Sequence, residues 1–581
     1  MATTDGNSPQ RETTPSLIPS SIPQKRALLE EDHSPAVSSP LNPDVASKAT
    51  TQKVQFQAPE DTTGNQTMAR EKRTKKDSLK KRESKGATGG GLDSSRSSPI
   101  PNKSPKEQPS EMAPLRYKLA PPKPTDFDLA RGPIFTPHHE VPDPSGNTIE
   151  FFETSDHVYN KKSFHYTHCI ADPTFPSMFY YRNTEPAPYG AHISFEDAAS
   201  HIYFNKSGTH VTTDKGFRMA RANVAVREGK WYWECKVTRG ILPDSSESSN
   251  GHVRIGFARR EASLDAPVGF DAYSYGIRDA SGQKVHMSRP KDFFPPNESI
   301  CEGDVIGLEI NLPSQHLHRK IVSGQYNPAV DAEDTHNPTD IEYPNIIRDR
   351  IPIRFKAHIY FEKIDYHTTK ELEELMNPSP MGPGSGTPSP PNPLHTVPAL
   401  RTLPGSYIKL YKNGKLMGTP WKNLLAFLPP ASKMGSGTTT PGTGASRDAL
   451  DDGEVGYYPA VSVFRGGAVE VNFGENGWWF PPESESEDVE MGGTEEAEKE
   501  TKVEEKEKEN DSKRRALAER YNEQIVEDIV YDVIDEVGFW AMGVGRDRVG
   551  GKVVGGEKVA IGGAGRGGEN DEEIKELVQD D

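Results

Sequence analysis

The chain has 581 residues, enough for several domains, but only 33% are hydrophobic, while 50 are proline and 51 glycine. Much of its length therefore cannot bury enough apolar surface to offset the entropy lost on folding. Three cysteines exclude a disulfide scaffold and a zinc module built from four cysteines of this chain. We find no run of about 18 apolar residues and no hydrophobic signal region, so we expect a soluble intracellular protein without a membrane partner.

The net charge of −17 is unevenly distributed along the chain. Residues 1–115 are rich in Ser, Thr, Pro and Lys, and we interpret them as disordered. Within them, residues 70–85 hold nine basic side chains against three acidic ones. This cluster predicts a nuclear-import signal, a weak contact with nucleosomal DNA, or only a solvated tail. Its central basic residues are Arg73, Lys75, Lys76, Lys80, Lys81 and Arg82.

Short β-type segments dominate residues 145–482, several of them alternating apolar and polar side chains. The dipeptide Asn413-Gly414 is typical of a tight hairpin turn. Many short strands without an amphipathic helix between them predict one all-β domain, an antiparallel sandwich. The expected strands are 201–204, 231–237, 252–257, 305–310, 355–361, 407–411, 458–464 and 468–473.

Three interruptions divide this predicted domain, near residues 312–350, 372–404 and 430–456. The second and third are rich in Pro, Gly, Ser and Thr. Long surface loops add little closure entropy, so we interpret all three as disordered insertions in one sandwich.

An amphipathic helix is predicted at residues 516–540, between an acidic linker (483–511, with fourteen Asp or Glu and four Lys) and a glycine-rich tail (541–581). Its apolar side chains recur at helical spacing on one stripe. A single helix of this length is marginal in water, so the stripe needs a cover. That cover is either its own domain or, as we favour, an apolar groove of another subunit. The stripe consists of Val526, Ile529, Val530, Val533 and Val537.

The order of the strand motifs resembles a SPRY domain. Residues 216–223, 229–235 and 253–257 are similar to its first half, and 303–307, 412–415, 458–462 and 471–474 to its second. Residues 265–278 are similar to one SPRY subfamily, the trithorax-group "absent, small or homeotic" subunit of COMPASS, the histone H3 lysine-4 methyltransferase complex. Because no cysteine precedes Cys169, the N-terminal zinc-finger module of animal members is not expected, and the chain resembles the short fungal form.

The resemblance implies a nuclear, non-catalytic scaffold that promotes the activity of a SET-domain methyltransferase. It also implies that the predicted helix docks into a small dimeric helical subunit of the "dumpy" type. The sandwich is expected to bind an acidic segment of a WD-repeat subunit through a basic and aromatic pocket. Transferred by position, this pocket consists of Phe217, Arg254, Pro267, Phe270 and Arg278.

Other function classes have weaker support in the sequence. His165, His168 and Cys169 lack a fourth ligand at motif spacing, and Gly563–Gly568 matches a dinucleotide fingerprint outside any strand–helix unit. We therefore expect no enzyme, cofactor or metal. Trp231, Trp233, Trp478 and Trp479 are interpreted as core or sandwich-edge residues. A SPRY substrate adaptor of a ubiquitin ligase and a nuclear RNA-associated SPRY protein remain the alternatives.

Overall fold

The computed structural model describes residues 122–142, 146–160, 163–172, 181–243, 249–331, 346–356, 358–377, 389–434, 450–482 and 514–541. The predicted region 1–115 with its basic cluster and the linker 483–511 lie outside these residues, as does all of the tail 541–581 except Ala541. Among the described helices, none has the length and apolar character that crossing a membrane requires.

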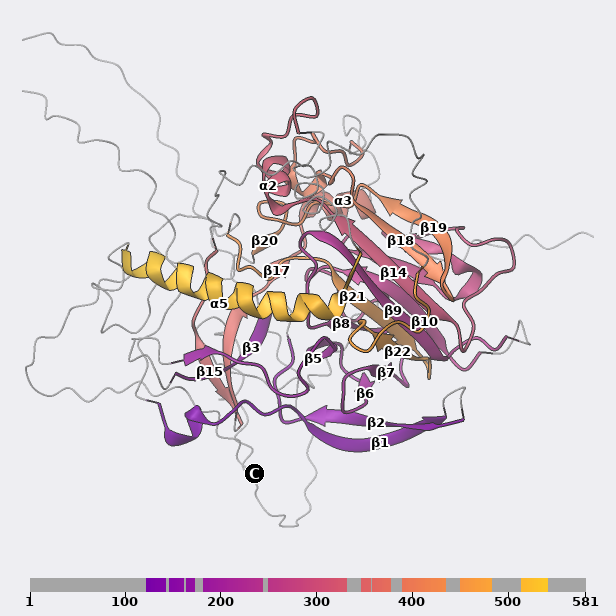
Figure 1. The fold of residues 1–581 in the computed structure, drawn as a ribbon, viewed down its shortest axis with the longest axis horizontal. Helices are drawn as coiled ribbons and strands as arrows, with labels where there is room; N and C mark the ends of the chain where they lie inside the picture. The colour runs from indigo at the N-terminus through magenta and orange to yellow at the C-terminus, as the bar shows by residue number, and fades with distance from the viewer. Residues whose placement is uncertain are drawn as a thin grey trace, which may run out of the picture. The chain divides into compact units, whose positions relative to one another are not determined.

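Two sheets form the sandwich (Figure 1). All their strand pairs are antiparallel except that between β9 and the short β23. In order across the first sheet, the strands are β1 (Ile134–Pro142), β2 (Thr148–Ser155), β6 (Tyr203–Phe204), β7 (His210–Thr212), β22 (Ala468–Asn472), β9 (Gly229–Arg239), β14 (Val305–Leu312), β18 (Tyr407–Lys412) and β19 (Lys415–Lys422), with β23 (Arg515–Ala516) beside β9. Those of the second sheet are β13 (Arg289–Lys291), β12 (Lys284–His286), β11 (Ser274–Arg278), β10 (His252–Ala258), β21 (Tyr458–Phe464), β8 (Arg218–Ala222) and β5 (Ile193–Ala198).

Alternating side chains of the central strands build the core between the sheets. Trp231, Trp233 and Val237 of β9 meet Ile255 and Phe257 of β10 in one hydrophobic cluster. Because successive side chains of a strand point to opposite faces, this period-2 pattern fixes which face of β9 points into the core between the sheets; Tyr232 and Glu234 on its other face are buried as well. The predicted all-β antiparallel sandwich is confirmed.

Turn chemistry was predicted well at one hairpin and missed at another. Asn413 and Gly414 have φ of 50° and 82° and connect β18 to β19, as the Asn-Gly signal indicates. The prediction of one strand over 355–361 is wrong. Phe355 pairs with His358 across a hairpin between β15 (Pro352–Phe355) and β16 (His358–Ile364), and Lys356 has φ of 51° in its turn.

A smaller sheet joins β15, β16, β3 (Phe164–Ala171) and β4 (Tyr181–Asn183), and β17 (Tyr366–His367) pairs with β20 (Lys433–Met434). The 3-10 helix η1 (Pro124–Phe127) is anchored to this sheet, since Asp126 accepts hydrogen bonds from Arg354 (2.6 Å) and Tyr181 (3.0 Å). The described fold therefore starts before the predicted boundary at residue 145.

Parts of the predicted interruptions belong to the fold. The first contains α2 (Gln315–Ser323), which begins where the Ser314 hydroxyl accepts from the Leu317 amide (3.1 Å) and ends at Gly324 with φ of 78°. Leu317 and Ile321 are in the core. The expectation of strands without a helix between them is wrong here, because nine residues offer too short a periodic pattern. The other short helices are η2 (Ala280–Gly282), α3 (Lys370–Met376) and η3 (Pro398–Leu400).

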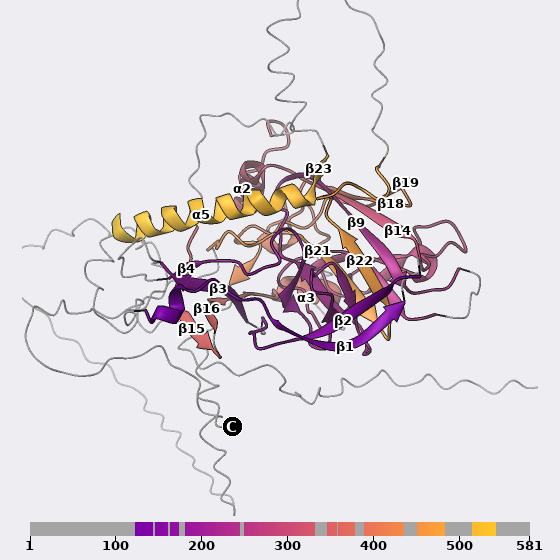
Figure 2. The same ribbon diagram turned by 60° about the horizontal axis from the view of Figure 1, so that its bottom comes forward.

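Helix α5 (Leu517–Ala541) follows β23 directly. It starts beside the sandwich and runs across the small sheet, as the two views in Figures 1 and 2 agree. Leu517 is fully buried in the main core and anchors this first turn. The predicted helix at 516–540 is thus present, one residue later at each end.

We predict that Trp233→Ala lowers the free energy of unfolding by about 3–5 kcal/mol, because a fully buried indole is lost and a cavity remains. Trp479→Ala is the control, since its side chain is 37% exposed and lies outside the core clusters of the described residues, and its effect should be clearly smaller. Denaturant unfolding of the two variants measures both values. Equal losses would contradict the assignment of Trp233 to the central core.

Candidate partner-binding surfaces

Two arginines face each other on adjacent strands of the second sheet. Arg254 of β10 lies directly opposite Arg278 of β11 in the register. Like charges at directly opposed positions destabilise a sheet, and their side chains stand on the same face. Arg278 has a hydrogen bond to Gln283 (3.3 Å), whereas Nε of Arg254 has no hydrogen-bond partner among the described residues. The pair therefore concentrates positive charge on this face; Nε of Arg254 is buried, and Arg278 is the more exposed of the two arginines.

Aromatic rings support Arg254 from one side. Its guanidinium lies 4.9 Å from the centre of the Phe217 ring, which packs in turn on Phe464 at 4.8 Å. Burial first and Arg278 second lower the pKa of Arg254 to about 10, so the guanidinium is still charged at neutral pH. A carboxylate placed beside the two guanidinium groups would relieve the repulsion between them.

The remaining two predicted residues lie on the neighbouring loop. Pro267 accepts a hydrogen bond from the Phe270 amide (3.0 Å), and Phe270 is 46% exposed. Between them, the Val268 amide donates to the hydroxyl of Ser462 (2.8 Å), which is paired with Arg254 in the strand register. The structure thus gathers all five predicted residues around β10 and β11.

Sequence reasoning missed the residues that position this surface. Ser462 holds the loop, and Phe464 supports Phe217. Both come from β21, which is far from β10 in the sequence but adjacent in the sheet. Their alternating positions in the predicted strand 458–464 were a signal for a shared face, but strand order could not be read from the sequence.

The second surface is α5, whose acidic and polar face contacts its own domain. The side chain of Gln524 accepts from the Ala225 amide (3.0 Å) and donates to the Asn223 carbonyl (3.1 Å). Arg520 donates to the Ala225 carbonyl (3.0 Å), and Tyr521 donates to Glu185 (2.5 Å). Further along the helix, Asp528, Asp532 and Asp535 contact the segment 346–350.

The apolar stripe lies roughly opposite these contacts, as the 3.6-residue period requires. Its members are 46–62% exposed, which is unusual for so many aliphatic side chains on one helix. The helix thus folds onto its own domain, but the domain does not cover the stripe. A groove of another subunit as its cover stays a prediction. The exposed residues are Val526, Ile529, Val530, Val533 and Val537.

A cleft of about 810 Å³ runs along one flank of α5. Ile525, Ile529 and Val533 border it on the helix side, and Tyr189, 66% exposed, borders it on the domain side. The apolar surface of the stripe thus continues towards the domain at this flank.

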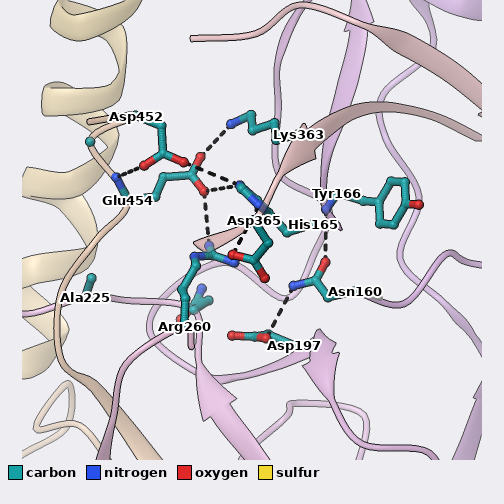
Figure 3. A network of polar contacts seen from close by, with 12 residues as sticks. Asn160, His165, Tyr166, Asp197, Ala225, Arg260, Lys363, Asp365, Asp452 and Glu454 are labelled. Carbon is teal, nitrogen blue, oxygen red and sulfur yellow. Dashed lines mark hydrogen bonds and ion pairs between the residues drawn. The ribbon is translucent and has the colours of Figure 1, made fainter. Parts of the chain in front are cut away.

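Beneath α5 lies a buried ion-pair network (Figure 3). Glu454 pairs with His165 (2.9 Å), Lys363 (2.5 Å) and Arg260 (3.1 Å). Burial opposes ionisation of Glu454, but Lys363 and His165 outweigh it and hold its pKa well below the usual value. The network joins β3, β16 and the loop 450–456.

The three candidate metal ligands, His165, His168 and Cys169, have different surroundings in the structure. His165 points to Asp452 and Glu454, whereas His168 pairs with Glu196 (2.9 Å), and Cys169 is buried in a separate apolar cluster. The three therefore do not converge. His165, Asp452 and Glu454 are close enough for one ion, but Lys363 and Arg260 already occupy the Glu454 carboxylate. Ion pairing accounts for this group.

The sequence of this chain is similar to that of known SPRY-domain proteins. The SPRY domain model matches residues 230–318. The COMPASS component cclA of Colletotrichum higginsianum is 57% identical over 100% of both chains. The cclA of Aspergillus fumigatus is 42% identical, covering 85% of this chain and 77% of its own. This chain belongs to the family of SPRY-domain COMPASS components.

The family reaches beyond these filamentous fungi. The Set1 complex component ash2 of Schizosaccharomyces pombe is 36% identical over 76% of this chain and 55% of its own length. The resemblance inferred from the motifs is therefore confirmed.

We predict an acid-sensitive contribution from Asp197, which receives two hydrogen bonds from Arg221 (2.6 and 2.7 Å). Burial alone would raise its pKa, but Arg221 outweighs burial and lowers it from 3.8 to about 2. A depressed folded-state pKa adds stability above pH 3.8 that is lost as the pH falls towards 2. The stability gap between the wild type and Asp197→Asn should therefore shrink by about 2 kcal/mol from pH 5 to pH 2.

Denaturant unfolding across this pH range measures the gap. Asp214→Asn is the control, because its pair with Lys215 is about half exposed and its pH-dependent change should be much smaller. A gap for Asp197→Asn that is constant with pH would contradict the assigned pairing.

Proposed function

We propose that this chain is a non-catalytic nuclear subunit of a histone H3 lysine-4 methyltransferase complex, which it serves through binding surfaces. Family membership supports the assignment to such a complex, since its relatives are named COMPASS and Set1 complex components. One observation supports a scaffold role in particular: α5 is held by its own domain while its apolar stripe faces away from that domain.

The stripe fits an apolar groove, and we assign it to a small dimeric helical subunit of the dumpy type. Valine and isoleucine side chains at helical spacing are the anchors that such grooves take up. Because α5 contacts its own domain through the opposite, acidic and polar face, the helix can bind its domain and the groove of the dimer at the same time.

The arginine surface fits an acidic segment, which we assign to a WD-repeat subunit. Arg254 and Arg278 offer planar donors for carboxylates, and Phe217, Pro267 and Phe270 supply apolar area beside them. Phenylalanine at 217 and 270 offers no hydroxyl, so charge pairing and ring packing carry this contact.

A subunit with two such surfaces can favour the active arrangement of a mobile SET domain. It does so by binding that arrangement better than others, which shifts the population without any catalytic group of its own. The basic residues Arg73, Lys75, Lys76, Lys80, Lys81 and Arg82 lie outside the described residues, and we assign them to nuclear import or weak nucleosomal DNA contact.

We predict that Arg254→Glu or Arg278→Glu weakens binding to the WD-repeat subunit by about 2 kcal/mol or more, the scale of an interface hot spot. Lys422→Glu, an exposed charge reversal on β19 of the other sheet, is the matched control. Calorimetric titration with the recombinant WD-repeat subunit measures the three affinities. Wild-type affinity for both arginine variants would refute the assigned surface.

We predict that Val530→Asp and Val533→Asp each weaken binding of the dumpy-type dimer by about 2 kcal/mol or more, because each places a charge in an apolar groove. The unfolding midpoint should change little, since the two side chains are 46% and 56% exposed in the free chain. Val330→Asp is the control, a valine that is 74% exposed outside α5.

A reconstituted complex with the SET-domain and WD-repeat subunits tests the same variants for methylation of histone H3 lysine 4. We expect a loss of stimulation with the α5 variants and none with Val330→Asp. Full stimulation without dimer binding would contradict the proposed role of the stripe.

A further inference from the structure

We call the surface under the second half of α5 its seat; it consists of residues 346–350 and 450–454, the ends of two predicted interruptions. Ile346 and Asp451 form a parallel bridge, and the Ile347 amide donates to the Asp451 carbonyl (2.8 Å). Residues 346–350 and 450–454 therefore lie side by side, although about a hundred residues separate them in the sequence. Gly453 lies directly under Tyr531 of the helix, so closely that an added Cβ would come within 2.8 Å of its ring.

Two arginines of this seat bind the acidic face of α5. Arg348 pairs with Asp528 (2.7 Å), and its backbone amide donates to Asp535 (3.1 Å). Arg350 pairs with Asp532 (2.6 Å), which also lies 3.5 Å from Arg348. The two guanidinium groups thus contact two successive turns of the helix, on the stretch that carries the stripe on its other side.

The pairs are partly shielded from water, so solvent screens them less than a fully exposed ion pair. The Arg348 and Arg350 side chains are 1% and 11% exposed, and those of Asp528 and Asp532 are 32% and 20% exposed. Burial opposes ionisation of Asp532, but Arg350 and Arg348 outweigh it and lower its pKa. Burial raises the pKa of Asp528 in spite of Arg348.

These ion pairs matter because a single helix is marginal in water. Without them, the helix would have to become ordered at the moment a partner binds. Ordering on binding reduces affinity, and a ligand already held in its bound form avoids that cost. A seat that covered the stripe would compete with the partner. Here the seat uses the opposite face, so it can order the stripe and leave it accessible.

We propose that Arg348 and Arg350 are positioning residues for partner docking: by holding the acidic face of α5, they present its apolar stripe pre-formed to the groove of a helical dimer. The proposal rests on the proposed function for the identity of the occupant. It also gives a role to two of the interruptions, whose described ends supply the seat.

The test compares Arg348→Gln/Arg350→Gln with the wild type in the full chain. Amide hydrogen exchange of residues 526–537 in the free chain is the first readout, and it does not depend on any partner. Titration with the recombinant dumpy-type dimer is the second. Arg182→Gln is the control, because Arg182 borders the same cleft and is 52% exposed, but its ion-pair partner is Asp172 (3.9 Å) and not a carboxylate of α5.

We expect the double variant to exchange at least about tenfold faster at these amides and to bind the dimer about tenfold more weakly. With saturating dimer, its exchange should return to that of the wild-type complex, which a general folding defect would not allow. Arg350→Gln alone, the more peripheral change, should show the same effects in smaller degree if the double variant fails to fold. Arg182→Gln should match the wild type.

Three results would overturn the proposal: unchanged exchange in the free variants, unchanged affinity despite faster exchange, or tighter binding, which would make the seat a competitor of the partner. If the wild-type chain shows protected amides sensitive to Arg348 and Arg350 but binds no dimer, the assigned occupant fails and the docking role fails with it. The seat contacts alone would then stand.

Discussion

The attachment of α5 by its acidic face is the interaction on which the rest of the account depends. A helix with carboxylates on one side and aliphatic side chains on the other can face a domain in two ways. Arg348 and Arg350 pair with Asp528 and Asp532, and together with the contacts of Arg520 and Gln524 in the first half of the helix they leave the stripe facing outwards. Had the stripe faced the domain, the chain would offer no apolar helix to a partner.

The second surface, around Arg254 and Arg278, has the opposite arrangement of charges. On α5 the charges are paired within the chain, and the apolar residues remain for a partner. At β10 and β11 two like charges oppose each other, and our proposal assigns their pairing to a partner. The domain thus offers one apolar and one cationic contact, and two chemically different partners can recognise them without competing.

The structural features that could be predicted from the sequence are those whose signal lies in neighbouring residues. Alternating strands, the Asn413-Gly414 turn and the stripe of α5 are local patterns, and they were predicted from the residues involved. The five residues around Arg254 came from a family resemblance, not from spacing. The hairpin at Lys356 carries no glycine or Asn-Gly signal, so its strands were read as one.

The seat of α5 could not be predicted, for a physical reason. Arg348 and Arg350 lie in a stretch that was interpreted as a disordered insertion, and their partners are about 180 residues away. Ion pairs between distant segments leave no repeating pattern in the sequence. The acidic face of α5 is equally typical of a helix face exposed to solvent. Only the strand pairing that brings Ile346 to Asp451 makes the contact apparent.

An experimental structure of the full chain bound to the dumpy-type dimer tests the central claim most directly. We expect that Arg348 and Arg350 remain paired with Asp528 and Asp532 while Val526, Val530, Val533 and Val537 are buried in the groove of the dimer. A complex in which α5 has left its seat, or in which the dimer covers another face of the helix, would contradict it.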